Sequence, residues 1–572
     1  MTVPCRNRLL ALVLALAALA CAMPLPARAA QPPAVSERFM VSTANPLATM
    51  AARDIILQGG SAVDAAIAAQ LVLTLTEPQS SGLGGGAFLL TYDAADGTVA
   101  SYDGRETAPA SATPELFLHP DGSVMDWSEA AEGGLPVGVP GVVAMLAMAH
   151  ADQGRLPWAD LFTPAIALAE KGFLLSPRLY EVLDWVEGPE RFPAFHAQFY
   201  TLDGARKAPG TRLTNPALAA TLRALADGGA EAFYHGAIAG QIVAAVNGSS
   251  VNPGAMTLDD LAAYHAVRRD AVCTAYRAWT ICGMGPPSSG GIAVAQILAL
   301  LERFDMAAVA PGSLEAVHLI AEAERLAYAD RDLFVADSDF VAVPVEALLD
   351  PAYLARRSAL IDPEASMGTA EAGLAAGDRA AFDDETNLGL STSHISIVDM
   401  EGNAVSMTTN IERGFGSRLM AGGFLLNNEL TDFSFEPEID GKPVANRVEA
   451  GKRPRSSMAP TLVLDEDGRL VMAIGTVGGS RIICYVAKTL IARLDWGLDI
   501  QAAIELPHFL NRNGATELED GTTLVDLVPA LEAMGHEVRL NTMDTGLAGF
   551  YIDGRTITGG ADPRREGTAL GR

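Results

Sequence analysis

The stretch "LGLSTSHISIVDM" (residues 388–400) places three hydroxyl side chains, Ser391, Thr392 and Ser393, directly before a histidine. Polar and apolar residues roughly alternate from Ser391 to Ser396, and the chain continues through "DMEGNAVSMTTN". This pattern predicts a half-buried strand, a tight turn and a second strand. Three hydroxyls at the start of a strand indicate either a solvated entrance to it or a nucleophile among them.

The sequence before this stretch is rich in helical patterns, and the sequence after it is rich in strands. Helices are predicted within residues 141–176, 214–246 and 258–266, and a long amphipathic helix over 313–334 with Ser313 as its N-cap. No Pro/Ser/Gly-rich linker or charge run divides the chain. The two parts are therefore expected to depend on each other rather than to fold as separate domains.

The segment "GLGGGA" (residues 82–87) satisfies the pattern G-x-G-x-x-A. It lies between a predicted helix and a predicted strand, whereas a dinucleotide-binding fingerprint requires a strand followed by a helix. The favoured interpretation is a tight turn with close backbone packing.

The composition limits the possible partners. The 572 residues are 49% hydrophobic and 19% charged, which is ample for a large core, and the formal net charge is -29. An anionic surface repels phosphate backbones, so nucleic acid is not an expected partner. Beyond the N-terminus no apolar run approaches the roughly 20 residues that span a bilayer, so stable membrane insertion is not expected.

Residues 1–29 have the pattern of a cleaved export signal. Arg6 and Arg8 precede an apolar run, and an A-x-A pattern ends at Ala29. This predicts a periplasmic or secreted protein. The alternatives are a buried first helix and, because Cys21 follows "AALA", a lipoprotein anchor.

Three cysteines lie outside that segment: Cys273, Cys282 and Cys484. The sequence "VCTAYRAWTIC" predicts a hairpin that sets Cys273 opposite Cys282, and an exported protein could oxidise this pair. Two buried thiols are an equal alternative. Three cysteines without a nearby histidine do not form a zinc site, and the 9 histidines are scattered singly.

The common catalytic motifs G-x-S-x-G, H-E-x-x-H and G-x-x-x-x-G-K-[ST] are absent from the sequence. A threonine at a chain N-terminus carries its own base, because its α-amino group titrates near pH ~8. An internal threonine needs a backbone cut to reach that state. The loop of small residues before the opening stretch suits such a cut, although periodicity alone does not select Thr392.

The sequence resembles the γ-glutamyltransferases (γ-glutamyl transpeptidases) from about residue 38 to the C-terminus. Motifs similar to that family occur in its order: "GGSAVDAAIAAQLVLTLTEPQSSGLGGGAFLL", "DGRETAP", "PPSSGGI", "AEAERLAYADRD", "TSHISIVDMEGNAVSMT", "GGFLLNNELTDFS", "KRPRSSMAPT" and "GTVGGSRI".

This resemblance implies an α+β fold of the N-terminal-nucleophile hydrolase type, a four-layer αββα sandwich. It also implies a cut between Ser391 and Thr392, giving a large subunit of residues 30–391 and a small catalytic subunit of residues 392–572. The expected reaction passes the γ-glutamyl group of glutathione or a related small molecule through a Thr392 ester to water, an amino acid or a peptide. No cofactor or metal is expected.

The resemblance also assigns the site residue by residue. Thr392 matches the nucleophile, and the backbone N–H groups of Gly478 and Gly479 match the family's oxyanion donors. The remaining matches bind the amino-acid head of the donor. These are Arg105, Ser456 and Ser457 for its carboxylate, and Glu429 and Asp432 for its ammonium group.

Two residues near the nucleophile depart from the family's pattern. Asn410 stands where a second threonine usually hydrogen-bonds the nucleophile, and an amide can also make that bond. Glu412 replaces an asparagine near the ammonium group, so the pocket would hold up to three carboxylates. These departures leave open a related acylase that cleaves glutaryl or β-lactam side-chain amides, and a non-catalytic amino-acid-binding relative.

Overall fold

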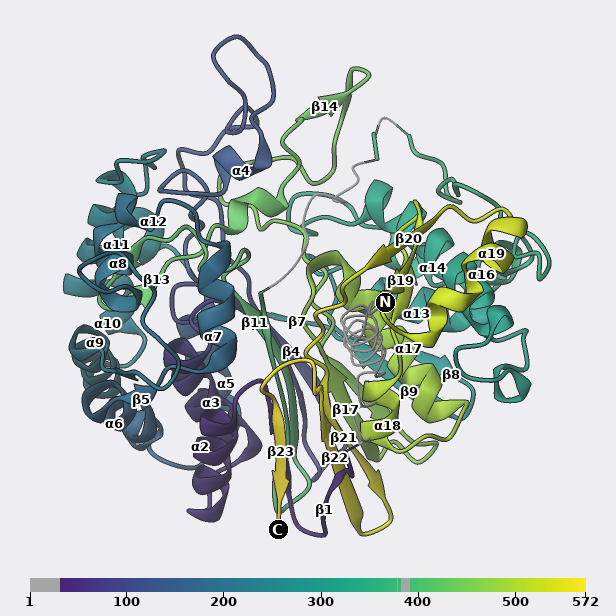
Figure 1. Cartoon of the computed structure of the whole chain (residues 1–572), viewed down its shortest axis with the longest axis horizontal. Helices are drawn as coiled ribbons and strands as arrows, with labels where there is room; N and C mark the ends of the chain where they lie inside the picture. The colour runs from purple at the N-terminus through teal and green to yellow at the C-terminus, as the bar shows by residue number, and fades with distance from the viewer. Residues whose placement is uncertain (1–30, 378, 382–390) are drawn as a thin grey trace, which may run out of the picture. The chain divides into compact units, whose positions relative to one another are not determined.

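Two seven-stranded antiparallel sheets face each other, and helices cover the outer face of each (Figure 1). The computed structural model describes residues 31–377, 379–381 and 391–572, and residues 33–572 form one unit. The expected four-layer αββα sandwich is confirmed. The export signal predicted over residues 1–29 lies outside the described residues, as do residues 382–390 of the loop before the expected cut.

The first sheet contains the opening stretch. Its strands, in spatial order, are β23 (Thr568–Gly571), β2 (Met40–Thr43), β10 (Ser393–Val398), β11 (Ala404–Asn410), β3 (Gly86–Tyr92), β4 (Val99–Gly104) and β7 (Val267–Arg269). Strands β10 and β11 pair with Ser396 opposite Ser406, and a turn at Asp399 joins them. The predicted strand, turn and strand are confirmed.

The second sheet is formed by β1 (Ala34–Ser36), β22 (Thr556–Ala561), β21 (Ala548–Asp553), β17 (Leu470–Gly475), β16 (Thr461–Leu464), β9 (Trp279–Gly283) and β8 (Val272–Tyr276), in that order. An apolar layer fills the space between the sheets. It combines Leu90 and Val398 of the first sheet with Leu462 and Phe550 of the second. The burial of these side chains holds the two sheets together.

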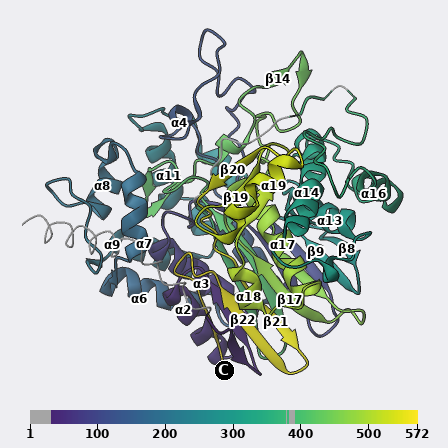
Figure 2. The ribbon, with the colours of Figure 1, turned by 45° about the vertical axis from the view of Figure 1, so that its right-hand side comes forward.

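Two groups of helices form the outer layers (Figures 1 and 2). The helices on the side of the first sheet are α2 (Pro46–Leu57), α3 (Ala62–Thr76), α5 (Val142–Gln153), α6 (Thr163–Lys171), α7 (Pro177–Val182), α8 (Pro193–Phe199), α9 (Pro216–Gly228), α10 (Glu231–Tyr234), α11 (Ala237–Asn247) and α12 (Leu258–Ala262). Those on the side of the second sheet are α13 (Gly290–Leu301), α14 (Leu314–Phe334), α15 (Val345–Leu348), α16 (Pro351–Ser358), α17 (Ile482–Leu494), α18 (Ile500–Glu505) and α19 (Val528–Ala533).

Shorter elements cover the edges of the sandwich. The segment α4 (Trp127–Ala130) lies near the hairpin of β14 (Glu438–Ile439) and β15 (Lys442–Pro443) in Figure 1. A three-stranded sheet is formed by β18 (Phe509–Asn511), β19 (Thr516–Glu519) and β20 (Val538–Asn541). Two further pairs are β12 (Met420–Ala421) with β13 (Phe424–Leu425), and β5 (Phe173–Leu174) with β6 (Arg212–Leu213).

The prediction that β10 is half-buried is wrong, because all six of its residues are buried. Ile395 and Ile397 pack on the helix side of the sheet with α3. The alternate residues His394 and Ser396 lie on the face toward the second sheet, where Ser396 Oγ donates to the carbonyl of Ala548 (3.1 Å). The alternation of polar and apolar residues therefore marks two different buried faces, not a solvated one.

Helix α14 begins after the N-cap Ser313, as predicted. The hydroxyl of Ser313 accepts a hydrogen bond from the N–H of Ala316. The helix predicted over 141–176 is divided into α5, a short 3₁₀ segment at Trp158–Phe162 and α6. Gly154 ends α5 and Pro157, which has no backbone N–H, begins the 3₁₀ turn. The helix predicted over 258–266 ends early at Ala262.

The glycine-rich turn of residues 82–87 packs against backbone, as predicted. A Cβ on Gly84 would lie 2.1 Å from the carbonyl oxygen of Leu425, and a Cβ on Gly85 would lie 2.0 Å from that of Asn410. These approaches require glycine and leave no room for a dinucleotide phosphate.

Cys273 and Cys282 face each other across the β8–β9 hairpin and are joined by a disulfide. Of the two alternatives that the sequence left open, the structure has the oxidised pair. Cys484 is a buried free thiol on α17.

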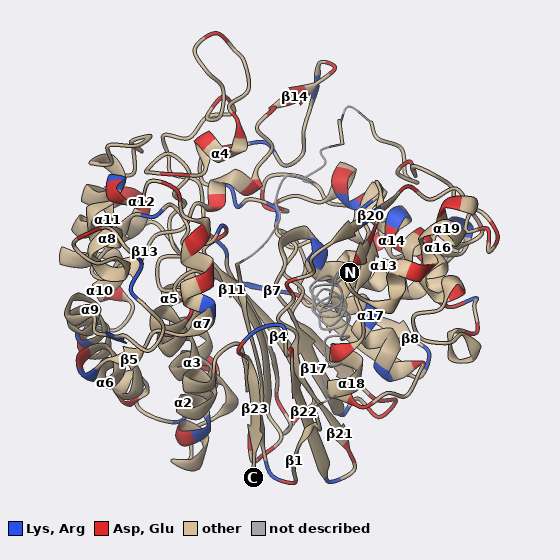
Figure 3. Ribbon diagram, in the orientation of Figure 1, with Lys and Arg blue, Asp and Glu red and all other residues tan. Residues whose placement is uncertain are grey.

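Both sheets combine strands from the two sides of Ser391. Strands β10, β11 and β23 follow this residue and pair with β2 and β3, which precede it; in the second sheet β16 pairs with β9 and β22 with β1. Charged side chains gather mainly on helices and loops, and the strands carry few of them (Figure 3). Among the described residues, no helix has the length and apolarity needed to cross a membrane.

The layer between the sheets can be tested at Phe550, which is fully buried there. The substitution Phe550→Ala removes a large apolar side chain and is expected to lower the free energy of unfolding by about 3–5 kcal/mol. The measurement is the midpoint of urea unfolding. Leu202→Ala, at a fully exposed leucine, is the control and should leave the midpoint unchanged. Equal shifts in both variants would contradict this packing.

Candidate functional site

Thr392 lies immediately before β10 at the end of the first sheet and is almost completely buried. Its backbone N–H donates to the carbonyl of Ser80 (3.1 Å), and its own carbonyl accepts from Nη1 of Arg565 (3.3 Å). Its φ is +88°, a region that a β-branched residue adopts only under strain from its surroundings. This strained torsion, about the N–Cα bond of Thr392, adjoins the Ser391–Thr392 peptide bond where the cut is expected.

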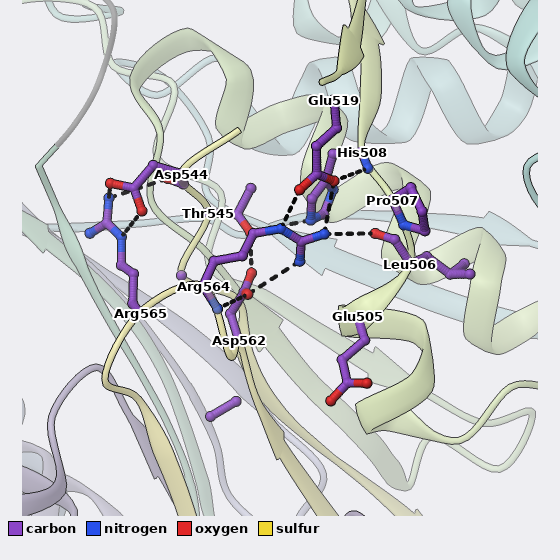
Figure 4. Close-up of polar contacts among 12 residues, drawn as sticks. Glu505, Leu506, Pro507, His508, Glu519, Asp544, Thr545, Asp562, Arg564 and Arg565 are labelled. Atoms are coloured by element: carbon purple, nitrogen blue, oxygen red, sulfur yellow. Dashed lines mark hydrogen bonds and ion pairs between the residues drawn. The ribbon is translucent and has the colours of Figure 1, made fainter. Parts of the chain in front are cut away.

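Arg565 is held in place by Asp544, which also pairs with Arg178 from a distant part of the chain. Asp544 accepts from Nε of Arg565 (3.2 Å) and from both terminal nitrogens of Arg178 (3.2 and 2.8 Å). In Figure 4 Arg565 points to Asp544, whereas Arg564 points away from it, to Glu519 and Asp562. Sequence reasoning missed Arg565, because it lies far along the chain from Thr392 and no motif near it indicates a site.

A pocket opens beside Thr392. It is lined by residues from five separate segments: Thr392; Asn410 and Glu412; Asp432; Arg455, Ser456, Ser457 and Met458; Gly479, Ser480 and Ile482. Seven of the ten residues that the resemblance assigned to catalysis or head-group binding thus line one pocket. Arg105, Glu429 and Gly478 lie just behind this lining.

Arg105 is completely buried and contacts the residues expected to bind the ammonium group. Its two terminal nitrogens donate to Glu429 and to Asp432. The other hydrogen bonds of its guanidinium go to the backbone carbonyls of Pro454 (3.2 Å) and Arg455 (3.0 Å). The expected carboxylate ligand and the expected ammonium ligands therefore form one ion-pair cluster.

Two more carboxyl groups adjoin this cluster. Glu412 accepts a hydrogen bond from Nδ2 of Asn428. Oε2 of Glu106 lies 3.9 Å from Nη1 of Arg105, and neither oxygen of Glu106 has a hydrogen-bond partner among the described residues. Sequence reasoning missed Glu106, although its place next to Arg105 in "DGRETAP" was the available signal.

Burial dominates the protonation of these groups. Removal from water, reinforced by the neighbouring Asp432 and Glu429, holds the pKa of Glu412 well above its usual value. Burial, reinforced by Glu429, does the same to the pKa of Glu106. Burial also raises the pKa of Glu429 to about 7, although Arg105 opposes the rise. Arg105 contacts three of the four carboxyl groups, Glu106, Glu429 and Asp432. A further cation bound nearby would lower the raised pKa values and favour the charged carboxylates.

Asn410 joins this cluster to the nucleophile's side of the pocket. Its Nδ2 donates to Glu429 (2.9 Å), while its Oδ1 has no hydrogen-bond partner among the described residues. The expected hydrogen bond from Asn410 to the nucleophile is therefore not among its contacts in this chain, and its catalytic role stays a prediction.

Ser456 and Ser457 both face the pocket with hydroxyls that accept hydrogen bonds. Oγ of Ser456 accepts from the N–H of Met458 (3.1 Å), and Oγ of Ser457 accepts from Nη2 of Arg331 (2.7 Å). Each hydroxyl hydrogen thus remains available to a ligand. This arrangement suits an anionic group such as a carboxylate.

Gly478 is the N-cap, and Gly479 the first residue, of the 3₁₀ turn Gly479–Arg481 that leads into α17. Their φ values are +134° and +59°, and a Cβ on Gly478 would lie 2.9 Å from the ring of Tyr485. Both positions therefore require glycine. Within the described residues, neither N–H donates to another backbone or side chain, so both remain free for an oxyanion.

His394, two residues after Thr392, is a structural residue. Its ring nitrogens contact Oγ1 of Thr408 and Oγ of Ser396 (both 2.9 Å), and burial lowers its pKa to about 3. It is neutral at physiological pH and lies between the two sheets rather than in the pocket.

A four-layer αββα sandwich with a threonine at the head of a central strand, opposite a free pair of glycine N–H groups, defines the class of N-terminal-nucleophile hydrolases. The family model described as Gamma-glutamyltranspeptidase matches residues 48–572. The chain belongs to the γ-glutamyltranspeptidase family.

Curated relatives and a solved structure agree with this assignment. The glutathione hydrolase proenzyme of Bacillus subtilis (strain 168) is 34% identical over 99% of this chain and 98% of its own length. That of Escherichia coli (strain K12) is 36% identical over 93% and 91%. The crystal structure of cephalosporin acylase from Bacillus halodurans superposes with a TM-score of 0.82 at 26% identity, covering 96% of this chain and 98% of the other.

The raised pKa of Glu429 leads to a prediction about stability. In the folded chain this carboxyl keeps its proton up to about pH 7, against an ordinary value of 4.5, so between these values the folded state binds the extra proton. Stability is therefore expected to fall as the pH rises through this window. Glu429→Gln, whose amide oxygen still accepts from Arg105, is expected to reduce that fall.

Urea unfolding at about pH 5 and about pH 8 measures the effect. Glu231→Gln, at an exposed glutamate, serves as the control. If the Glu429→Gln and unmutated chains lose stability equally across the window, the assignment to Glu429 is wrong.

Proposed function

We propose that this chain is a γ-glutamyl hydrolase/transpeptidase that matures by cutting itself before Thr392. One observation carries the proposal. Thr392 lines the same pocket as Asp432, Ser456 and Ser457, so a nucleophile and a set of groups suited to an amino-acid head lie side by side. The family membership of the chain supports the same reaction class.

Maturation would begin at the strained residue Thr392. Its Oγ1 attacks the carbonyl carbon of Ser391, the Ser391–Thr392 peptide C–N bond breaks, and the nitrogen takes up a proton to become the α-amino group of Thr392. Water then hydrolyses the resulting ester and leaves Ser391 with a carboxylate. The positive φ of Thr392 supports this step, since breaking the bond relieves the strain.

Turnover would reuse the same oxygen. The new α-amino group takes the proton of Oγ1, which attacks the γ-carbonyl of the donor and forms a γ-glutamyl ester. The free N–H groups of Gly478 and Gly479 would stabilise the oxyanion, by about 3–4 kcal/mol each. The leaving amine departs with a proton, and water or an amino acid then takes the acyl group.

The charge cluster fits a zwitterionic head. An α-carboxylate would bind to Arg105 and to the hydroxyls of Ser456 and Ser457, and the ammonium would sit among Glu412, Glu429 and Asp432. Arg105 already contacts two carboxylates, Glu429 and Asp432. A bound zwitterion would add one anionic and one cationic group to this cluster at the same time. The cluster then keeps its net charge, and the ammonium adds charged hydrogen-bond donors to its carboxylates.

A glutaryl or cephalosporin-type acylase is the second candidate, and the likeness to a cephalosporin acylase favours it. A glutaryl group has no ammonium, so it would bring no cation to Glu412, Glu429 and Asp432, and Arg105 would stay the cation that contacts Glu429 and Asp432. A non-catalytic amino-acid-binding protein is a third candidate, but free Gly478 and Gly479 donors beside Thr392 serve chemistry rather than binding alone.

The mature protein in this proposal is a heterodimer of residues 30–391 and 392–572 that acts outside the cytoplasm. The Cys273–Cys282 disulfide supports export, because such bonds persist mainly in oxidising compartments. Its partners are small-molecule donors and acceptors.

Thr392→Ala is expected to abolish the cut and to leave one inactive band on a denaturing gel, where the unmutated chain gives two. Intact mass spectrometry locates the cut and detects a γ-glutamyl adduct on Thr392. Ser393→Ala, at the neighbouring hydroxyl, is the control and should still give two bands. Active, unmutated enzyme that remains a single chain would refute self-cleavage.

Comparing γ-glutamyl-anilide with glutaryl-anilide separates the two enzymatic candidates. The γ-glutamyl substrate is expected to have the higher kcat/KM. Asp432→Asn should lower that value by about 10- to 100-fold, the worth of one charged hydrogen bond, and affect glutaryl turnover much less. Faster turnover of the glutaryl substrate, unaffected by Asp432→Asn, would favour the acylase.

A further inference from the structure

Three buried side chains far from the pocket converge on one point. His318 and Glu322 lie on α14, and His536 lies just before β20. One ligand atom from each, all three within 4.8 Å of one another, forms a group suited to a metal ion. None of these residues takes part in the reaction proposed above, and the scattered histidines of the sequence gave no sign of the group.

The direction of the His318 ring follows from its neighbours. Nε2 lies 2.7 Å from the backbone carbonyl of Asp362, which can only accept, so Nε2 carries the hydrogen. The lone pair of Nδ1 then points at Nε2 of His536, 2.7 Å away. The two rings are nearly perpendicular, at 88°.

His536 is oriented in the same manner. Its Nδ1 lies 2.8 Å from Oγ1 of Thr516, so Nε2 is the nitrogen that faces His318. In metal sites, ligating histidines almost always direct their second ring nitrogen to a backbone carbonyl or another polar group in this way. Both rings therefore have the outer contacts of metal ligands.

Glu322 completes the set from one helical turn beyond His318, on the same face of α14. Its carboxylate accepts from Oγ of Ser366 (2.8 Å), the N–H of Met367 (2.8 Å) and Nε of Arg325 (3.2 Å). An ionised carboxylate has about four acceptor positions, so one remains for a cation.

We propose that Nδ1 of His318, Nε2 of His536 and the carboxylate of Glu322 bind one divalent transition-metal ion, with zinc as the first candidate. Two imidazoles and a carboxylate suit zinc, whereas magnesium and calcium prefer oxygen ligands throughout. Nitrogens bound at about 2.0–2.1 Å to one tetrahedral ion lie about 3.3 Å apart, so the rings separate by about half an ångström on binding. A water molecule fills the fourth position.

The site would join distant parts of the chain. His318, Glu322 and the segment of Asp362 to Met367 precede Ser391, whereas Thr516 and His536 follow it. In the mature heterodimer the ion would thus bridge the two subunits. That consequence depends on the proposed cut, but metal binding does not.

The test uses the full-length purified protein, stripped with a strong chelator and reloaded with Zn²⁺ or Co²⁺. The expected result is one equivalent of zinc retained on dialysis against a weak chelator, and visible absorption bands of tetrahedral Co²⁺. His536→Gln and Glu322→Gln should lose both signals. His235→Gln is the control, because His235 and Glu231 form an exposed His–Glu pair four residues apart, and it should retain both.

An unmutated protein that retains no zinc and gives no Co²⁺ bands would overturn the proposal, and the two rings would then share a proton. Equal retention in His536→Gln would overturn it as well, since the metal would be bound by surface carboxylates. The first outcome needs no variant to fold. The two-band gel and anilide turnover report separately on the proposed function.

Discussion

The position of β10 in the interior of the first sheet is the constraint on which the rest of the structure depends. The strand hydrogen-bonds to β2 on one edge and to β11 on the other, α3 packs on one face, and the second sheet covers the other. On the face toward the second sheet, the ring of His394 hydrogen-bonds to Ser396, and Ser396 donates to the carbonyl of Ala548. A strand held on four sides has one register, and this register fixes Thr392 at the mouth of the pocket.

The pocket contains buried carboxyl groups whose charged forms are unfavourable. Burying Arg105 with four carboxyl groups costs more than one guanidinium can offset, and the raised pKa values of Glu106, Glu412 and Glu429 express that cost. A fold optimised for stability alone would replace some of these groups with apolar ones. The ammonium group of the proposed substrate would bring a further cation to these groups.

Local patterns in the sequence predicted the elements well wherever local forces decide them. The N-cap Ser313, the hairpin that pairs Cys273 with Cys282 and the glycine turn of residues 82–87 all follow from short-range sterics and hydrogen bonding. The burial of β10 did not, since alternation cannot distinguish a solvated face from a second buried one that holds satisfied polar groups. The resemblance to a family, rather than periodicity, selected Thr392 among the three hydroxyls.

Contacts between distant segments were beyond the reach of the sequence. Arg565 reaches Thr392 only because β22 and the turn after it return to the head of β10. His536 meets His318 only because β18 and α19 pack against α14. Glu106 could have been found from its neighbour Arg105, but its lack of hydrogen-bond partners is a property of the folded chain.

Because each sheet pairs strands from both sides of Ser391, a cut before Thr392 would produce two polypeptides with no interface in the usual sense. Separating them would break the β2–β10, β3–β11 and β9–β16 ladders and expose both cores, which amounts to unfolding. Such a pair should not dissociate on dilution, nor exchange subunits with other molecules of its kind. The two polypeptides would be held together because they folded as one chain, and not through a reversible association of two separately folded chains.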